Sequence, residues 1–145
     1  MNGAAPVVVV DASIGVKWAV TEREDGVADA MWLLERHARG DIVLAVPGTF
    51  RLEWLNALVS RGLAVPDVLD AARDLERSAL CWYEIDETLS FEAVALASAH
   101  SLTVYDAAYL ALANRLDAGL VTADTALAQA AGDRLVHVVD FKPGS

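Results

Sequence analysis

The feature that most limits the fold of this chain is a run of four valines, residues 7–10, that ends at Asp11. β-branched residues favour strands, and a run without polar residues is typical of a strand that is buried on both faces. Such strands occur mainly in parallel sheets, where helices cover both faces. The run therefore predicts an α/β protein with a parallel sheet.

The rest of the chain continues the alternation of strands and helices that such a sheet requires. Apolar residues at helical spacing and glycines behind them predict the helices, and short apolar runs predict the strands. The predicted strands are residues 6–10, 42–46, 80–85, 119–122 and 135–139, and the predicted helices are residues 13–20, 25–39, 49–61, 66–77, 89–100, 106–116 and 125–130. A chain of 145 residues fits one domain, residues 1–145.

Composition restricts the environment and the partners of the protein. The mean hydropathy of +0.36 is high for a soluble monomer and favours an oligomer. A formal net charge of -10 argues against binding to nucleic acid mainly through phosphate contacts, although bound divalent cations can reverse the local sign of the charge. We find no signal peptide or membrane span, and the single cysteine, Cys81, excludes an internal disulfide. We expect a cytoplasmic protein without membrane contact.

Four acidic residues lie at positions where a parallel sheet would present a ligand site. Ligands bind beyond the carboxyl ends of the strands, and Asp11 and Asp124 follow the first and fourth predicted strands. Asp106 lies at a predicted helix start, and Glu53 lies in a mostly apolar helix. Taken singly, the three aspartates are also ordinary helix caps, and Glu53 is also consistent with a solvated helix face.

A cluster of these acids would need a cation. Two carboxylates about 4 Å apart repel by roughly 4 kcal/mol at an effective dielectric constant of 20, so they gather only around a cation or a shared proton. Mg²⁺ and Mn²⁺ prefer carboxylate and water oxygens. Asn56, one helical turn beyond Glu53, would add an amide on the same face.

Four segments together resemble the PIN domain, and specifically the VapC-type toxins of prokaryotic toxin-antitoxin pairs. These segments are residues 7–18, 47–58, 105–113 and 121–127, and each contains one of the four acids in the order typical of the family. The resemblance implies a three-layer α/β/α sandwich with a five-stranded parallel sheet. It also implies an endoribonuclease that depends on Mg²⁺ or Mn²⁺, acts as a homodimer and is neutralised by a small VapB-like antitoxin.

The resemblance assigns the acidic pocket and its hydroxyl neighbours Ser13 and Thr122, whereas Asn56 is added by its helical spacing and Lys17 and Arg51 because they are basic residues near an acidic motif. It implies that RNA is hydrolysed to a 3′-hydroxyl and a 5′-phosphate, with the four acids as catalytic residues and metal ligands. We expect Asp11 and Asp106 to be the principal ligands. The residues with assigned roles are the acids Asp11, Glu53, Asp106 and Asp124, the supporting residues Ser13, Asn56 and Thr122, and the candidate RNA-guiding cations Lys17 and Arg51.

Two other readings of the sequence stay open. A PIN fold can serve as a catalytically silent interaction module, although the presence of all four acids argues against this. A receiver-like signalling domain would use Asp86 as its phosphate acceptor together with Lys142, but it needs an acidic pair after the first strand. Ala12 and Ser13 follow Asp11 instead, and Ser13 also replaces the second acid of an Asp-x-Asp phosphatase.

Overall fold

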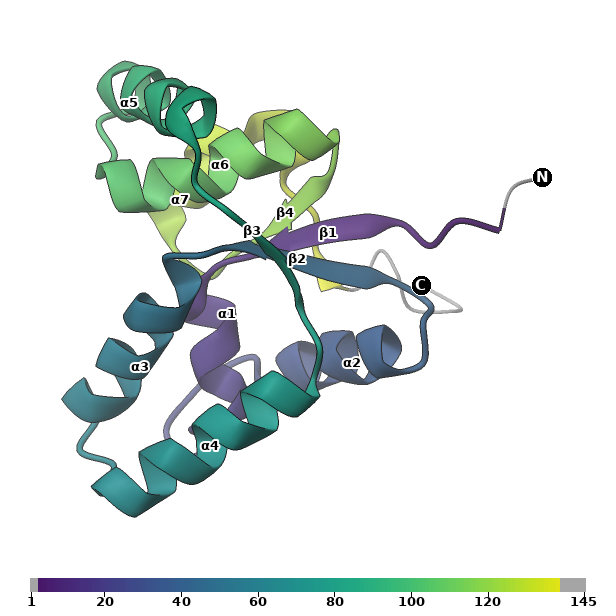
Figure 1. Cartoon of the computed structure of the whole chain (residues 1–145), viewed down its shortest axis with the longest axis vertical. Helices are drawn as coiled ribbons and strands as arrows, with labels where there is room; N and C mark the ends of the chain where they lie inside the picture. Colours follow the sequence, from purple (N-terminus) through teal and green to yellow (C-terminus); the bar gives the residue numbers. More distant parts are fainter. Residues whose placement is uncertain (1–2, 139–145) are drawn as a thin grey trace.

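The computed structural model describes residues 3–138, and its centre is a four-stranded sheet (Figure 1). All strand pairs are parallel, and the order across the sheet is β3-β2-β1-β4. The predicted parallel α/β architecture is therefore confirmed. The strands are β1 Val7–Val10, β2 Val43–Pro47, β3 Cys81–Tyr83 and β4 Gly119–Val121.

Helices cover both faces of this sheet. Figure 1 shows α5, α6 and α7 on one side and α1 to α4 on the other. Among residues 3–138, none of the helices has the length and apolar character of a transmembrane segment. The helices are α1 Ala12–Gly15, α2 Val27–Ala38, α3 Phe50–Ser60, α4 Val65–Arg77, α5 Glu87–His100, α6 Val104–Leu116 and α7 Thr125–Ala131, with 3-10 turns η1 Val16–Trp18 and η2 Gly132–Arg134.

The prediction of a fifth strand at residues 135–139 is wrong for the described part of the chain. Leu135 forms one isolated parallel bridge with Leu120, and the Val136 N–H donates to the Leu120 carbonyl at 3.0 Å. The ladder is short because β4 has only three residues and η2 holds the chain in a turn until Arg134. Val139 lies outside the described residues.

Several helices begin one or two residues from their predicted starts, and two of the differences bear on the site. The helix predicted at residues 106–116 begins at Val104, because the Thr103 hydroxyl accepts a hydrogen bond from the Asp106 N–H at 3.1 Å and caps the helix. The helix predicted at residues 13–20 is divided into α1 and the tighter turn η1. Asp106 therefore lies in the first turn of α6 and is not its cap.

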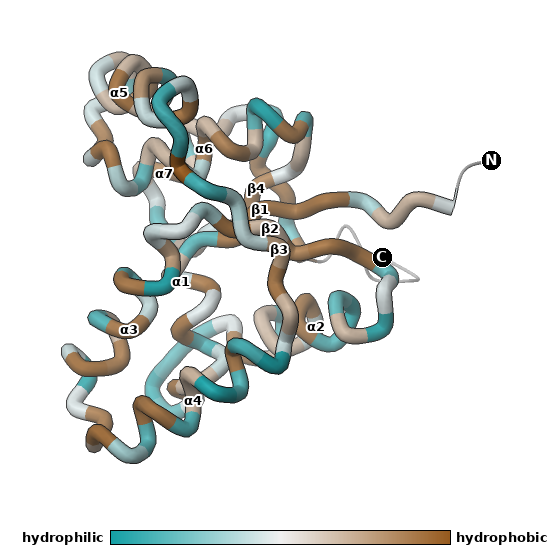
Figure 2. Tube along the Cα trace, in the orientation of Figure 1, coloured by the Kyte–Doolittle hydropathy of each residue, from teal (hydrophilic) through white to brown (hydrophobic). Residues whose placement is uncertain are grey.

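The core forms where the valine run meets the helices. Val8, Val9 and Val10 are at most 1% exposed, and Figure 2 shows β1 and β2 as mostly hydrophobic. Helix α3 contributes a stripe of buried side chains to this core, formed by Phe50, Trp54 and Leu58. Such a stripe at i, i+4 and i+8 fixes the rotation of α3 about its axis.

A close contact joins α3 to α1. The Trp54 indole N–H donates to the Gly15 carbonyl at 2.9 Å, and the indole is only 2% exposed. A Cβ atom added at Gly15 would lie 2.6 Å from the ring of Phe50. Only glycine allows α3 to pack this closely against the helix that follows Asp11.

Gly15→Ala should therefore destabilise the protein, although alanine is the better helix former. Overpacking of a full core costs about 1–3 kcal/mol, which exceeds the roughly 1 kcal/mol that alanine gains over glycine in a helix. Urea unfolding would measure this difference. Gly48→Ala is the control, because a Cβ atom there meets nothing closer than 3.8 Å. Equal stability of the two variants would contradict the close packing of α1 against α3.

Candidate functional site

The site lies at the carboxyl ends of β1 and β4, where the order of the sheet reverses. From β1 the chain proceeds through β2 to β3 on one side, whereas β4 adds to the other side of β1. Val10 is paired with Val121, so Asp11 and Thr122 leave the sheet next to each other. Such switch points are where ligands bind in open parallel sheets.

Asp11 is the most buried acid of the site, with an exposed fraction of 4%. One carboxylate oxygen, Oδ1, accepts from the Ser13 hydroxyl at 2.5 Å and from the Ile14 N–H at 3.3 Å, which caps α1. The other, Oδ2, accepts from the Thr122 hydroxyl at 2.5 Å. Neutral donors therefore hold both oxygens of Asp11 in place.

The same hydroxyls connect Asp11 to the loop that follows β4. Ser13 Oγ accepts from the Ala123 N–H, and Thr122 Oγ1 accepts from the Asp124 N–H, both at 2.9 Å. Asp124 is exposed and caps α7, because its Oδ1 accepts from the Leu127 N–H at 2.8 Å. Asp124 thus lies at the rim of the site on a loop that is tied to Asp11.

Glu53 reaches the site from the first turn of α3. It is half-buried, and its Oε1 accepts a hydrogen bond from the Tyr109 hydroxyl at 2.9 Å. Trp54, the next residue, is held against α1 by the hydrogen bond from its indole N–H to the Gly15 carbonyl. The packing of α3 therefore directs Glu53 toward α6.

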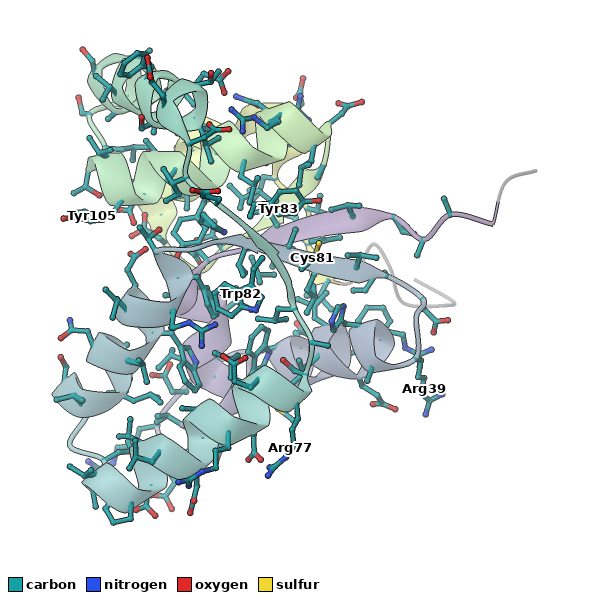
Figure 3. The ribbon with its side chains drawn as sticks, in the orientation of Figure 1. Arg39, Arg77, Cys81, Trp82, Tyr83 and Tyr105 are labelled. Carbon is teal, nitrogen blue, oxygen red and sulfur yellow. The ribbon has the colours of Figure 1, made fainter. Side chains whose placement is uncertain are left out.

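Asp106 comes from the first turn of α6. It is half-buried, and Tyr105, labelled in Figure 3, precedes it at the start of the helix. A carboxylate in this first turn is favoured by the helix dipole. The four acids are thus supplied by four different segments of the chain.

The charges of these acids affect one another. Burial raises the pKa of Asp11, and the nearby Asp106 charge adds to this, while hydrogen bonds from Ser13, Thr122 and Ile14 oppose it. Burial also raises the pKa of Glu53, against the Tyr109 hydrogen bond and together with the charges of Asp106 and Asp11. For Asp106, burial and then the charge of Asp124 raise the pKa. The acids therefore form one electrostatic cluster.

No basic side chain neutralises this cluster in the described part of the chain. Lysine and arginine ion pairs within residues 3–138 involve other acids, such as Glu24 and Glu76. Within the same residues, no group of three or more His, Cys, Asp or Glu side chains is arranged so that it could hold a metal ion. Mg²⁺ usually binds through only one or two carboxylates and keeps several waters, so an acidic cluster of oxygen donors still fits such a cation.

The remaining residues predicted from sequence lie in different surroundings. Lys17 is buried and donates to Glu24 Oε2 at 3.2 Å and to the Asp25 carbonyl at 2.6 Å, so its ammonium group is already engaged. Arg51 pairs with Glu76 and stacks over Trp82, 4.4 Å from the ring centroid. Asn56 is exposed on α3. The contacts of Lys17 with Glu24 and Asp25 argue against it as an RNA-guiding residue, because a phosphate would have to displace both partners.

Tyr109 is the residue of the site that sequence reasoning missed. It lies one turn after Asp106 in an alanine-rich helix that is mostly buried. The signal in the sequence is that the hydroxyl of a buried tyrosine needs a hydrogen-bond partner. Asp86, by contrast, has a structural role: it caps α5 through the Leu89 N–H and pairs with Arg115. Lys142 lies outside the described residues.

Comparison with known proteins decides the family. The family model of the PIN domain matches residues 8–133, which include all four acids. The chain belongs to the PIN domain family. The predicted resemblance is therefore confirmed, and the receiver-like alternative is wrong. Among curated proteins, no sequence matches the chain.

Solved structures agree with this fold assignment. PAE2754 from Pyrobaculum aerophilum has a TM-score of 0.65 at 24% identity, over 94% of both chains. The toxin VapC20 from Mycobacterium tuberculosis, which cleaves the sarcin-ricin loop, has a TM-score of 0.69 at 15% identity, over 85% of this chain and 94% of that one. A toxin-antitoxin complex from Klebsiella pneumoniae has a TM-score of 0.67 at 19% identity, over 90% and 97%.

The raised pKa values of Asp11, Glu53 and Asp106 predict an unusual pH dependence of stability. An acid with a raised pKa binds its proton more tightly in the folded state, so its unfavourable contribution is present at neutral pH and disappears as the pH falls. In EDTA, the Tm of the wild type should rise as the pH falls from neutral toward the ordinary carboxyl pKa of about 4.

Asp106→Asn should reduce this rise by several degrees, because it removes a charge from the cluster. Asp133→Asn is the control, since Asp133 is exposed on η2 away from the cluster. Differential scanning fluorimetry measures both variants against the wild type. The same Tm rise in Asp106→Asn as in Asp133→Asn would show that the acids do not interact.

Proposed function

We propose that this PIN domain is a metal-dependent endoribonuclease of the VapC toxin type. The observation that carries the proposal is the cluster of four acids, which no basic side chain neutralises within residues 3–138 and which lies at the switch point of the sheet. PIN domains generally act as nucleases, and the solved structures similar in fold include a VapC toxin and a toxin-antitoxin complex.

In this proposal, Mg²⁺ or Mn²⁺ is held by Asp11, Glu53, Asp106 and Asp124. A bound cation supplies Lewis acidity, which activates water and stabilises negative charge on the leaving oxygen. The residues of the chain arrange the site for this chemistry. Asp11 is fixed by hydroxyls, and Asp106 extends from a helix start.

Asp11 and Asp106 remain our principal ligands. The pKa of each is raised by burial and by a neighbouring carboxylate, so a bound cation would offset both unfavourable effects. Asp124 uses one oxygen to cap α7, which leaves the other oxygen for a ligand. The roles of Ser13 and Thr122 are to orient Asp11, since both hydroxyls donate to it.

RNA binding by such an acidic protein would depend on the cations at the site. A net charge of -10 repels a polyanion, whereas divalent ions in the cluster would reverse the sign of the potential there. Arg51 has an exposed fraction of 44% for its side chain and could turn from Glu76 to a phosphate. We therefore retain Arg51 as an RNA-guiding candidate.

An apolar groove between η1, α2, α3 and α4 fits the predicted antitoxin. Its volume is about 310 Å³, and Trp18, Trp54 and Leu75 contribute apolar lining. Asp67, Asp70 and Asp74 line the same groove from α4. This combination suits an amphipathic helix with basic residues beside its apolar face. We infer that the antitoxin of this protein binds here.

The homodimer remains a prediction. Exposed apolar side chains supply a surface that a second copy could cover, because Phe91 and Val94 of α5 are 64% and 55% exposed. Leu52 of α3 and Tyr105 of α6 are similarly exposed, at 72% and 63%. Such side chains agree with the high mean hydropathy of the chain.

The nuclease proposal predicts that Asp11→Asn and Asp106→Asn lose RNA cleavage in Mg²⁺ or Mn²⁺ by about 100-fold or more, since changes to outer-shell partners alone cost about 10–100-fold. Cleavage of total RNA and sequencing of the new ends would measure this loss and would identify the expected 3′-hydroxyl and 5′-phosphate products.

The control for this experiment is Asp133→Asn, which changes the net charge by the same amount outside the cluster. It should cleave RNA as the wild type does. A wild type without metal-dependent cleavage would favour the catalytically silent interaction module. Cleavage by Asp11→Asn at the wild-type rate would remove Asp11 from the site.

The antitoxin proposal predicts that the purified pair of toxin and antitoxin is inactive at equimolar ratio. The protein encoded immediately upstream is the first partner to test. Ala71→Arg should weaken this pair by at least about tenfold, because a large cation fills the half-buried groove position and repels basic residues of the partner. Full nuclease activity of the equimolar wild-type pair would refute the proposal.

A further inference from the structure

The geometry points to Tyr109 as a positioning residue: its hydroxyl holds Oε1 of Glu53 and thereby leaves Oε2 as the oxygen available to a cation. The hydrogen bond from Tyr109 Oη to Glu53 Oε1 is 2.9 Å long. This inference rests on the proposed function, because it assigns a role in the same site. It implies that Glu53 binds a cation through one oxygen.

Burial makes this hydrogen bond difficult to replace. Tyr109 is 0% exposed, and its neighbours on α6, such as Ala108 and Leu110, are buried apolar residues. A buried phenol hydroxyl without a partner is costly, and solvent does not reach this one. Glu53 is the acceptor that the fold offers to it.

The hydroxyl of Tyr109 also remains a donor. A phenol hydroxyl is protonated at neutral pH, and Tyr109 Oη lies within hydrogen-bond distance of Glu53 Oε1. Tyr109 is therefore the donor of this bond, and the Glu53 carboxylate is the acceptor.

Glu53 needs such a donor because like charges surround it. Asp106 and Asp11 both disfavour its ionised form, and no basic side chain within residues 3–138 pairs with it. A glutamate side chain has several rotatable bonds, so it could turn away toward water. The bond from Tyr109 opposes this movement and keeps the carboxylate at the site.

The position of Tyr109 couples two helices of the site. Asp106 and Tyr109 are three residues apart on α6, so they lie on neighbouring positions of one helix face. The same helix thus contributes one proposed ligand and orients a second ligand on α3. A shift of α6 relative to α3 would move both.

The test is Tyr109→Phe, which removes the hydroxyl and keeps the buried ring. Calorimetric titration with Mn²⁺ alone should show binding about tenfold weaker than in the wild type, the lower end of the loss expected for an outer-shell partner. RNA cleavage at limiting Mn²⁺ should fall accordingly. Tyr83→Phe, on β3, is the matched control and should stay within about twofold of the wild type in both measurements.

A double-mutant cycle distinguishes positioning from a general structural effect. If Tyr109 acts through Glu53, Tyr109→Phe should cause no further loss of Mn²⁺ affinity in a Glu53→Gln background. Additive losses would overturn the inference, and so would wild-type affinity and cleavage in Tyr109→Phe.

The two proposals can fail separately. A wild type that binds Mn²⁺ without cleaving RNA would refute the nuclease, while the affinities would still decide the role of Tyr109. An active wild type together with an equally active and equally tight-binding Tyr109→Phe would refute only the positioning role. A wild type that does not bind Mn²⁺ would overturn both.

Discussion

The structure of the site depends on one constraint, the burial of the Asp11 carboxylate at the end of β1, where no basic side chain of residues 3–138 forms an ion pair with it. A buried carboxylate is tolerated only when hydrogen bonds replace its lost water. Ser13, Thr122 and the Ile14 N–H provide these bonds, and all three are neutral donors. They stabilise the position of the carboxylate and leave its negative charge in place, so the charge remains available to an external cation.

The other acids add to the same charge, and the fold holds them against their mutual repulsion. Glu53 depends on α3, whose rotation is set by the buried stripe that includes Trp54 and by its contact with Gly15. Asp106 depends on α6, which Thr103 caps. Packing energy from the core therefore offsets the unfavourable electrostatics of the site. Enzyme sites commonly combine such local strain with stability elsewhere in the fold.

The distribution of charge also explains how an acidic protein could act on RNA. Within residues 3–138, basic side chains such as Lys17 and Arg51 form ion pairs with acids outside the cluster, Glu24 and Glu76. The cluster of acids thus keeps a net negative charge. Under the proposed function, divalent ions would bind there before RNA, and the apolar groove beside α4 would be a separate surface for a protein partner.

The sequence by itself determined the parallel α/β architecture and the PIN family, and it selected the four candidate acids. These depend on local patterns: the valine run before Asp11, the helical spacing of apolar residues and short motifs around each acid. Only the tertiary structure decided which groups meet. The bond from Tyr109 to Glu53 spans 56 residues, and that from Thr122 to Asp11 spans 111. The ion pair that engages Lys17 spans only 7 residues, yet it and the single bridge that replaces the fifth strand also depend on how these segments pack. Such contacts depend on how helices and strands pack, and no local sequence pattern shows which residues that packing brings together.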